Sequence, residues 1–143
     1  MNVTQILKLK GSTAVETVSP NATVNEVIGE LSRKGIGALV VSGEGGGVDG
    51  IVSERDIVRV LGAEGASCLS RRVSEVMTAK VIGCSMADSA LSVLERMSKG
   101  RFRHMPVVED GRMVGLLSIG DVVKARISEI ESDNKALVEM LHG

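Results

Sequence analysis

The apolar positions of this sequence change their spacing in a regular order along the chain. Between Val24 and Leu31 they recur at intervals of three and four residues, which is typical of a helix with one buried face. Thr23 directly precedes this run, and Glu26 lies three residues after Thr23. This pattern predicts an N-terminal capping box. Gly35 predicts the end of the helix.

Three shorter segments have the character of strands. Ala38–Val41 is continuously apolar, and Gly50–Val52 follows it after the glycine-rich loop Ser42–Gly47, so the two segments predict a hairpin. Glu16–Val18 predicts a short strand before the helix that contains Val24–Leu31, and a further helix is expected after Ser53. The order is therefore strand, helix, strand, strand, helix.

The second half of the chain repeats this order. Gly50–Asp56 reads G-I-V-S-E-R-D, and Gly115–Asp121 reads G-L-L-S-I-G-D; Val3–Leu7 loosely echoes Val73–Met77. In the second copy the expected elements are a strand at Lys80–Gly83, a helix at Ser89–Met97, a hairpin of Met105–Val108 and Met113–Leu117 around Glu109–Arg112, and a helix after Ser118. We predict an α/β (α+β) fold built from two tandem β-α-β-β-α repeats.

We expect the first repeat, with an N-terminal helix, at residues 1–65, and the second at 66–127. The segment rich in Gly, Ala and Ser after about residue 62 would link them, and an amphipathic helix would cover 122–143. A copy of about 60 residues has only a marginal core, so the two copies are expected to pack sheet against sheet as one pseudo-twofold module.

The last helix carries apolar residues at heptad spacing with one polar position. Two interpretations are open: the seam packs on its own domain, or it pairs with a second copy and forms a homodimer. The seam consists of Val123, Ile127, Ile130, Asn134, Leu137 and Leu141.

Composition narrows the classes of function. The 143 residues carry a net charge of −1, which argues against general nucleic-acid binding, and Phe102 is the one aromatic residue, which excludes aromatic base-stacking platforms. No apolar run is long enough to span a membrane, and no signal peptide opens the chain. Cys68 and Cys84 form no disulfide framework, so a reducing cytoplasm is the expected location.

The repeated motif is Gly, two apolar residues, Ser, two variable residues and Asp. A Ser-x-x-Asp pattern at the start of a helix can be a capping box and nothing more. Its duplication after a strand also fits ligand binding, because a helix N-terminus attracts phosphate and a carboxylate can accept two ribose hydroxyls. In that interpretation Gly50 and Gly115 would let a ligand approach the backbone closely.

These segments, together with Ile36–Val41 and Arg103–Val108, resemble a pair of cystathionine-β-synthase-type (CBS) domains, a Bateman module, from about Val3 to Arg126. The resemblance implies two repeats that meet through their sheets, with two ligand clefts. It also implies AMP, ADP, ATP, NAD(H) or S-adenosylmethionine as ligand, and a disc-shaped homodimer of two modules.

The resemblance further implies site residues. Asp56 and Asp121 would hold ribose hydroxyls, Ser53 and Ser118 would contact ribose or phosphate, and Arg55 could reach a phosphate. The basic pair Arg103 and His104 would face phosphate. The adenine would lie between the backbone near Ala38 and Met105 and the residues Val18, Ile36, Val81 and Pro106.

The two copies differ at the basic positions. Arg55 corresponds to Gly120, whereas Arg103 and His104 correspond to Gly37 and Ala38. We therefore expect two non-equivalent sites, one suited to a monophosphate such as AMP and one to a longer nucleotide such as NAD(H).

The expected function is a nucleotide-responsive regulatory module, not an enzyme, because no activated nucleophile, paired carboxylates or metal-ligand spacing is evident. The chain ends soon after the second repeat, so it is expected to act in trans on a partner protein. The alternative is a structural homodimerisation module without a physiological ligand.

Overall fold

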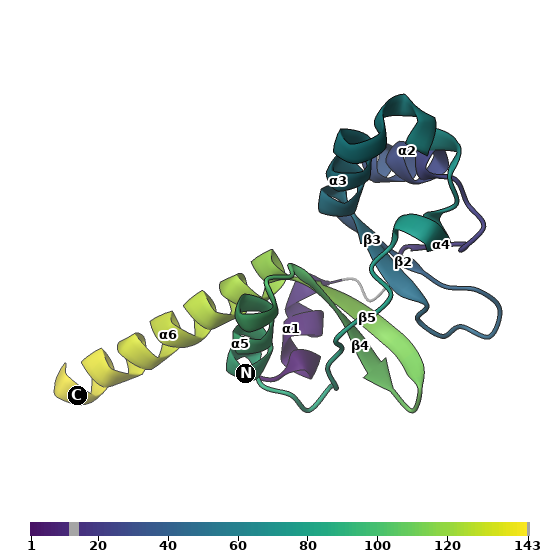
Figure 1. The fold of residues 1–143 in the computed structure, drawn as a ribbon. Helices are drawn as coiled ribbons and strands as arrows, with labels where there is room; N and C mark the ends of the chain where they lie inside the picture. Colours follow the sequence, from purple (N-terminus) through teal and green to yellow (C-terminus); the bar gives the residue numbers. More distant parts are fainter. Residues whose placement is uncertain (12–14, 143) are drawn as a thin grey trace. The chain divides into compact units, whose positions relative to one another are not determined.

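The computed structural model describes residues 1–11 and 15–142, which form two compact units (Figure 1). One unit consists of residues 15–82 and 110–113, and we call it the first-repeat unit. The other consists of residues 1–11, 83–109 and 114–142, and we call it the second-repeat unit. The helix at the start of the chain is thus part of the compact unit that contains the second repeat.

The first-repeat unit has a three-stranded sheet in the order β1-β2-β3. Strand β1 runs parallel to β2, and β2 pairs antiparallel with β3. All four residues of β2 are buried, as expected for a central strand. The elements are β1 (Thr17–Val18), α2 (Val24–Lys34), β2 (Ala38–Val41), β3 (Gly50–Ser53), α3 (Glu54–Glu64), a 3-10 helix (Gly65–Ser70) and α4 (Val73–Val76).

Helix α2 begins and ends at the predicted residues. The Thr23 hydroxyl accepts a hydrogen bond from the Glu26 backbone N–H, and Gly35 ends the helix in the left-handed conformation with a φ of 62°. The apolar face of α2 contributes Val24, Val27 and Leu31 to the core, which also contains Leu39 and Val52 from the sheet.

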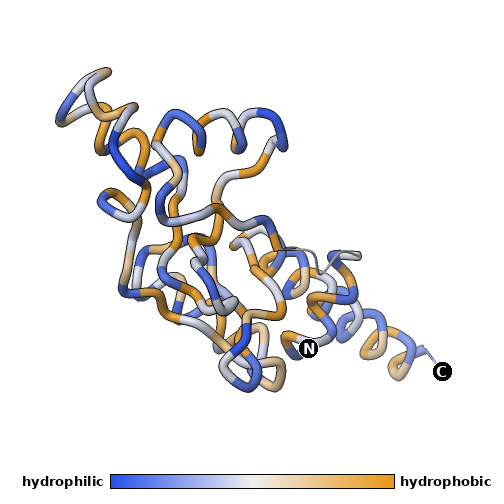
Figure 2. Tube along the Cα trace, turned by 90° about the vertical axis from the view of Figure 1, so that its right-hand side faces the viewer, coloured by the Kyte–Doolittle hydropathy of each residue, from blue (hydrophilic) through white to orange (hydrophobic). Residues whose placement is uncertain are grey.

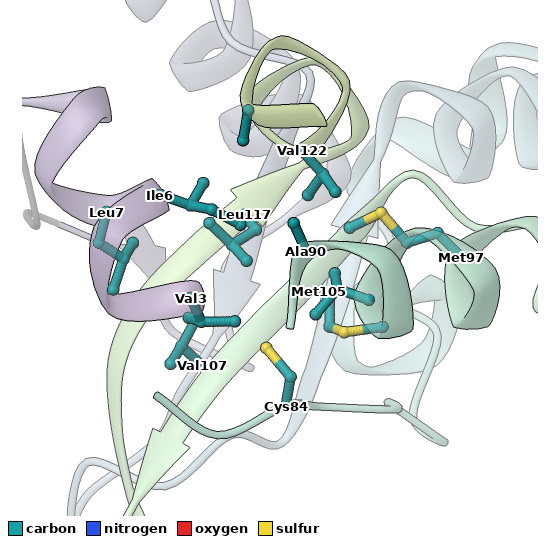
Figure 3. Packing of buried hydrophobic residues seen from close by; sticks show 12 residues of the cluster. Val3, Ile6, Leu7, Cys84, Ala90, Met97, Met105, Val107, Leu117 and Val122 are labelled. Carbon is teal, nitrogen blue, oxygen red and sulfur yellow. The ribbon is translucent and has the colours of Figure 1, made fainter. Parts of the chain in front are cut away.

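The second-repeat unit contains α1 (Val3–Lys10), α5 (Ala90–Gly100), β4 (His104–Glu109) and α6 (Ile119–His142). Strand β5 (Arg112–Ser118) belongs to it from Val114 onward, since residues 110–113 are part of the first-repeat unit. Strands β4 and β5 form a hairpin whose turn residues Asp110 and Gly111 both have positive φ, as a two-residue turn requires. Figure 3 shows how α1, α5, α6 and the hairpin enclose one apolar core. Its residues include Val3, Ile6, Met97, Met105, Leu117 and Val122.

The predicted strand at residues 80–83 is wrong. Only an isolated parallel bridge between Cys84 and Val107 forms there, through hydrogen bonds of Cys84 with Pro106 and Val108. Residues 81–83 before it have no regular secondary structure.

The segment after residue 62 is folded and not an open linker. Helix α3 continues to Glu64, the 3-10 helix follows it, and Cys68 within that helix is fully buried in the core of the first-repeat unit. The backbone N–H of Val24 donates to the carbonyl of Arg71, which fastens the end of this segment to α2. The repeat boundaries at 65 and 66 stay a prediction.

Helix α6 begins at the motif and continues without a break to His142. Its first turns pack through Val122 and Ala125, which are buried. Beyond them apolar and polar residues alternate along an exposed helix, as the stretch near the C-terminus in Figure 2 shows. Among the helices that the structure describes, none is long and apolar enough to cross a membrane.

Candidate functional site

The first copy of the motif lies where β3 leads directly into α3. The Ser53 side chain caps the helix by accepting from the backbone N–H of Asp56. In return, Oδ2 of Asp56 accepts from the Ser53 backbone N–H at 2.9 Å and from the Ser53 hydroxyl at 3.1 Å. The motif is therefore a complete capping box, as the simpler interpretation predicted.

Asp56 also makes contacts that a cap does not need. Its Oδ1 accepts from the guanidinium of Arg59 at 2.9 Å and from the hydroxyl of Thr78 at 3.2 Å. Thr78 is held in place because its backbone exchanges two hydrogen bonds with Ile51 on β3. Asp56 is only 7% exposed and is the one buried charged residue among the residues described. Its carboxylate is thus fixed from several sides.

The second copy has the same backbone arrangement where β5 leads into α6. The Ser118 backbone N–H donates to Oδ2 of Asp121 at 2.9 Å, and the Asp121 N–H donates to the Ser118 hydroxyl at 3.1 Å. Here the additional partner is Lys10 of α1, whose Nζ lies 3.1 Å from the same Oδ2. The two units therefore present the same Ser-x-x-Asp constellation with different neighbours.

The Asp121 carboxyl has opposing influences on its pKa. Burial raises the pKa, but the hydrogen bond from the Ser118 backbone and the contact with Lys10 outweigh burial. The net pKa lies below the usual range of an aspartic acid. Asp121 is therefore an ionised hydrogen-bond acceptor at neutral pH.

The expected role of the motif glycines is wrong, because protein atoms fill the space beside them. A Cβ at Gly50 would lie 2.7 Å from both the Met77 sulfur and the Thr78 carbonyl oxygen. A Cβ at Gly115 would lie 2.9 Å from a terminal carbon of Leu7. The lack of a side chain at these glycines thus makes room for Leu7 of α1 and for Met77 after α4, and not for a ligand.

Positions 37 and 103 lie beside the motif in their respective units. The backbone N–H of Glu54 donates to the Gly37 carbonyl at 3.0 Å, and that of Ile119 donates to the Arg103 carbonyl at 2.8 Å. Ala38 is the register partner of Ser53. The structure thus brings the backbone of Arg103, and with it the start of β4, next to the second motif. That Arg103 and His104 face a phosphate stays a prediction.

Other predicted residues lie further from the motif or inside the core. Val18 is the register partner of Val41, at the end of β2 opposite to Ala38. Met105 is fully buried in the core, so only its backbone could face a ligand. Pro106 is also buried in β4, Ile36 packs against the core of the first-repeat unit, and Val81 lies in the irregular segment before Cys84.

The remaining polar candidates lie at or near the surface. Arg55 and Arg103 are exposed and His104 is partly buried. Within residues 1–11 and 15–142, no group of three or more His, Cys, Asp or Glu side chains could hold a metal ion. Cys68 and Cys84 are free and buried, and burial raises the pKa of the Cys84 thiol to about 11.

Three residues at the aspartates were not identified from the sequence. Arg59 lies three residues after Asp56 on the same helix, a spacing that could have indicated the ion pair. Thr78 and Lys10 follow the two segments that echo each other, Val73–Met77 and Val3–Leu7. The similarity of these two segments is evident in the sequence. Which aspartate each segment approaches depends on tertiary packing, which the sequence pattern does not predict.

Comparison with known proteins agrees with this architecture. The CBS domain family model matches residues 8–63 and again 73–128. The CBS domain-containing protein CBSX3, mitochondrial, of Arabidopsis thaliana is 32% identical over 148 residues, which cover 99% of this chain and 72% of that protein.

Two solved structures share the fold. The CBS-domain containing protein ATU1752 from Agrobacterium tumefaciens is 43% identical, with a TM-score of 0.85 over 88% of this chain and 99% of that chain. The CBS domain protein PAE2072 from Pyrobaculum aerophilum, complexed with AMP, is 26% identical, with a TM-score of 0.75 over 85% of this chain and 89% of that chain. With its two matched repeats, the chain belongs to the CBS-domain family.

Proposed function

We propose that this chain is a regulatory module that binds adenine nucleotides through Asp56 and Asp121. One observation carries the proposal: both units place an ordered Ser-x-x-Asp carboxylate where a strand leads into a helix. A carboxylate there can accept the hydroxyls of a ribose, while the helix N-terminus favours the phosphate. The similar protein from Pyrobaculum aerophilum, whose structure is complexed with AMP, supports this ligand class.

The capping role does not compete with ligand binding. In both units the backbone bond of the cap uses Oδ2 of the aspartate. In the first-repeat unit Oδ1 accepts from Arg59, whose side chain is 65% exposed and can move away at little cost. A ribose hydroxyl can replace this guanidinium as donor without disturbing the cap.

The surroundings of the two aspartates support two non-equivalent sites. Asp56 contacts Arg59 and Thr78 and follows Arg55 in the chain. Asp121 contacts Lys10, and the backbone of Arg103 is hydrogen-bonded to Ile119, two residues before Asp121. We infer that one site takes a monophosphate such as AMP and that the other takes a longer nucleotide such as NAD(H). Binding regulates a partner protein in trans if the ligand has unequal affinity for two arrangements of the module.

Asp56→Ala and Asp121→Ala are each expected to weaken one binding event by at least about tenfold, because each removes a charged acceptor of two hydrogen bonds. Isothermal titration calorimetry with AMP and with NADH, run separately on the wild type and on each variant, measures the effect. Identical profiles for the two variants would contradict the non-equivalence of the sites.

Each substitution also removes part of a helix cap, so a control for stability is needed. Thr23→Ala removes the cap of α2 and leaves both motifs intact. It should retain both binding events. If Thr23→Ala loses binding as the aspartate variants do, the aspartates act through stability and not as ligand acceptors.

Helix α6 favours a second role, that of a homodimerisation element. Its heptad seam is exposed in the single chain: Ile127 is 51% exposed, Ile130 48% and Leu137 58%. Asn134 interrupts the seam at an a position, which in two-stranded coiled coils favours a parallel pair in register. In that pairing Arg126 of one copy faces Glu131 of the other, so the flanking charges are complementary.

We therefore expect Ile130→Glu combined with Leu137→Glu to convert a dimer into a monomer, because both carboxylates would be buried in the seam. Both residues are exposed in the single chain, so its own fold should be retained. Light scattering of the native protein measures the mass. Ser132→Glu, on the same exposed helix but outside the seam, is the control, and a wild-type monomer would refute this role.

We also propose a reducing location, specifically the cytoplasm, since both cysteines are free and buried. The similar Arabidopsis thaliana protein is named as mitochondrial, and free thiols by themselves do not distinguish the cytoplasm from another reducing compartment.

A further inference from the structure

Lys10 brings a positive charge to the second motif from outside the second repeat. It is the last residue of α1, and Gly11 ends that helix directly after it in the left-handed conformation. Its Nζ lies 3.1 Å from Oδ2 of Asp121 and donates to the Leu116 carbonyl at 2.7 Å. The two contacts fix the ammonium group beside the carboxylate.

The first-repeat unit has a different group in the related place. Leu7 packs against Gly115 as Met77 packs against Gly50, so the end of α1 and the segment after α4 occupy related positions. That segment offers the uncharged hydroxyl of Thr78 to Asp56, whereas α1 offers the ammonium group of Lys10 to Asp121. Both aspartates have a cationic partner, but Arg59 lies on the same helix as Asp56, whereas Lys10 reaches Asp121 from a different helix, outside the motif.

We propose that Lys10 is a specificity-determining residue that makes the Asp121 site prefer phosphate-bearing adenine nucleotides over neutral adenosine. The proposal rests on the proposed function, in which Asp121 holds the ribose.

The physical reason is the balance of charge beside the ribose. An ionised Asp121 attracts the ribose hydroxyls but repels the phosphate attached to the same sugar. Lys10 offsets that repulsion at a distance of one hydrogen bond from the carboxylate. Its side chain is one-third exposed (33%), so the ammonium group can turn toward a phosphate while it stays near Asp121. Adenosine, which has no phosphate, gains nothing from the charge.

The test uses the 143-residue chain with Asp56→Ala, so that the titration measures binding at the second site alone. Isothermal titration calorimetry gives the dissociation constants of AMP and adenosine with and without Lys10→Met, which keeps most of the side-chain length and removes the charge. We expect AMP to bind about fivefold more weakly and adenosine equally well. Lys10→Arg should restore the preference, and added salt should weaken the effect of Lys10.

Lys8→Met is the matched control, because Lys8 is an exposed lysine in the same last turn of α1. It should leave both dissociation constants unchanged. Equal tightening of AMP and adenosine by Lys10→Met would show that Lys10 competes for Asp121, and equal weakening would show that it only positions the carboxylate. Either result, or no change, overturns the inference.

Asp121→Ala separates this inference from the proposed function. If it leaves AMP binding intact in the same background, Asp121 is not a ribose acceptor and the proposed function fails at this site. If Asp121→Ala abolishes AMP binding while Lys10→Met has no effect on the preference, only the inference fails.

Discussion

Gly50→Ala is expected to lower the free energy of unfolding by about 1–3 kcal/mol, a cost typical of overpacking in a well-packed region. The added methyl group would lie 2.7 Å from the Met77 sulfur and 2.7 Å from the Thr78 carbonyl oxygen. The sulfur belongs to a flexible side chain, but the carbonyl accepts the backbone N–H of Ile51 at 3.0 Å. The strain therefore falls on the backbone that positions Thr78 at Asp56. Urea unfolding followed by far-ultraviolet circular dichroism measures the change.

Two other glycine variants test this explanation. Gly115→Ala would meet only the end of the Leu7 side chain, so it should cost less than Gly50→Ala. Gly29→Ala, inside α2, meets no atom within 4 Å and should be neutral or stabilising by about 0.5–1 kcal/mol. Equal stability of Gly50→Ala and Gly29→Ala would show that Met77 and Thr78 do not restrict this position.

Leu117→Ala is expected to have the larger effect, about 2–5 kcal/mol, because it leaves a cavity in the core of the second-repeat unit. Leu117 is 0% exposed and lies among residues of α1, α5 and α6 (Figure 3). Ser118 follows it directly, so loosening this core should also weaken nucleotide binding at Asp121. The same urea titration measures stability, and calorimetry measures binding.

Leu9→Ala is the matched control, because it removes the same side-chain atoms at an exposed position. Leu9 lies on α1 and is 63% exposed, so its truncation should change the free energy of unfolding by less than about 0.5 kcal/mol. If Leu117→Ala and Leu9→Ala have the same urea midpoint, Leu117 is not a core residue.

Much of the local structure follows from the sequence. The spacing of apolar residues located α2, β2, β3 and the β4–β5 hairpin, because a buried face has the period of its element. The end of α5 shows the limit of such signals. Arg101 ends this helix in the left-handed conformation with a φ of 55°, where Gly35 does so for α2. An arginine gives no indication of that conformation.

The duplicated Ser-x-x-Asp pattern was also evident from the sequence, and the structure has the expected capping hydrogen bonds at both copies. The role of the two aspartates in binding stays a prediction. The neighbours of the aspartates were only partly identified. No sequence pattern connects Lys10 with Asp121, or Thr78 with Asp56, because these contacts join segments far apart in the chain.

The sequence alone was sufficient to predict the repeat, the order of the elements in the first copy and the two Ser-x-x-Asp caps, since each of these features is recognised from short local patterns. Only the folded structure shows that α1 joins the second-repeat unit and that the apolar seam of α6 is exposed. It also shows that Leu7 and Met77 pack against the motif glycines. Long-range packing governs these features. The spacing of apolar residues predicts which face of an element can be buried, but it does not predict which other element covers that face.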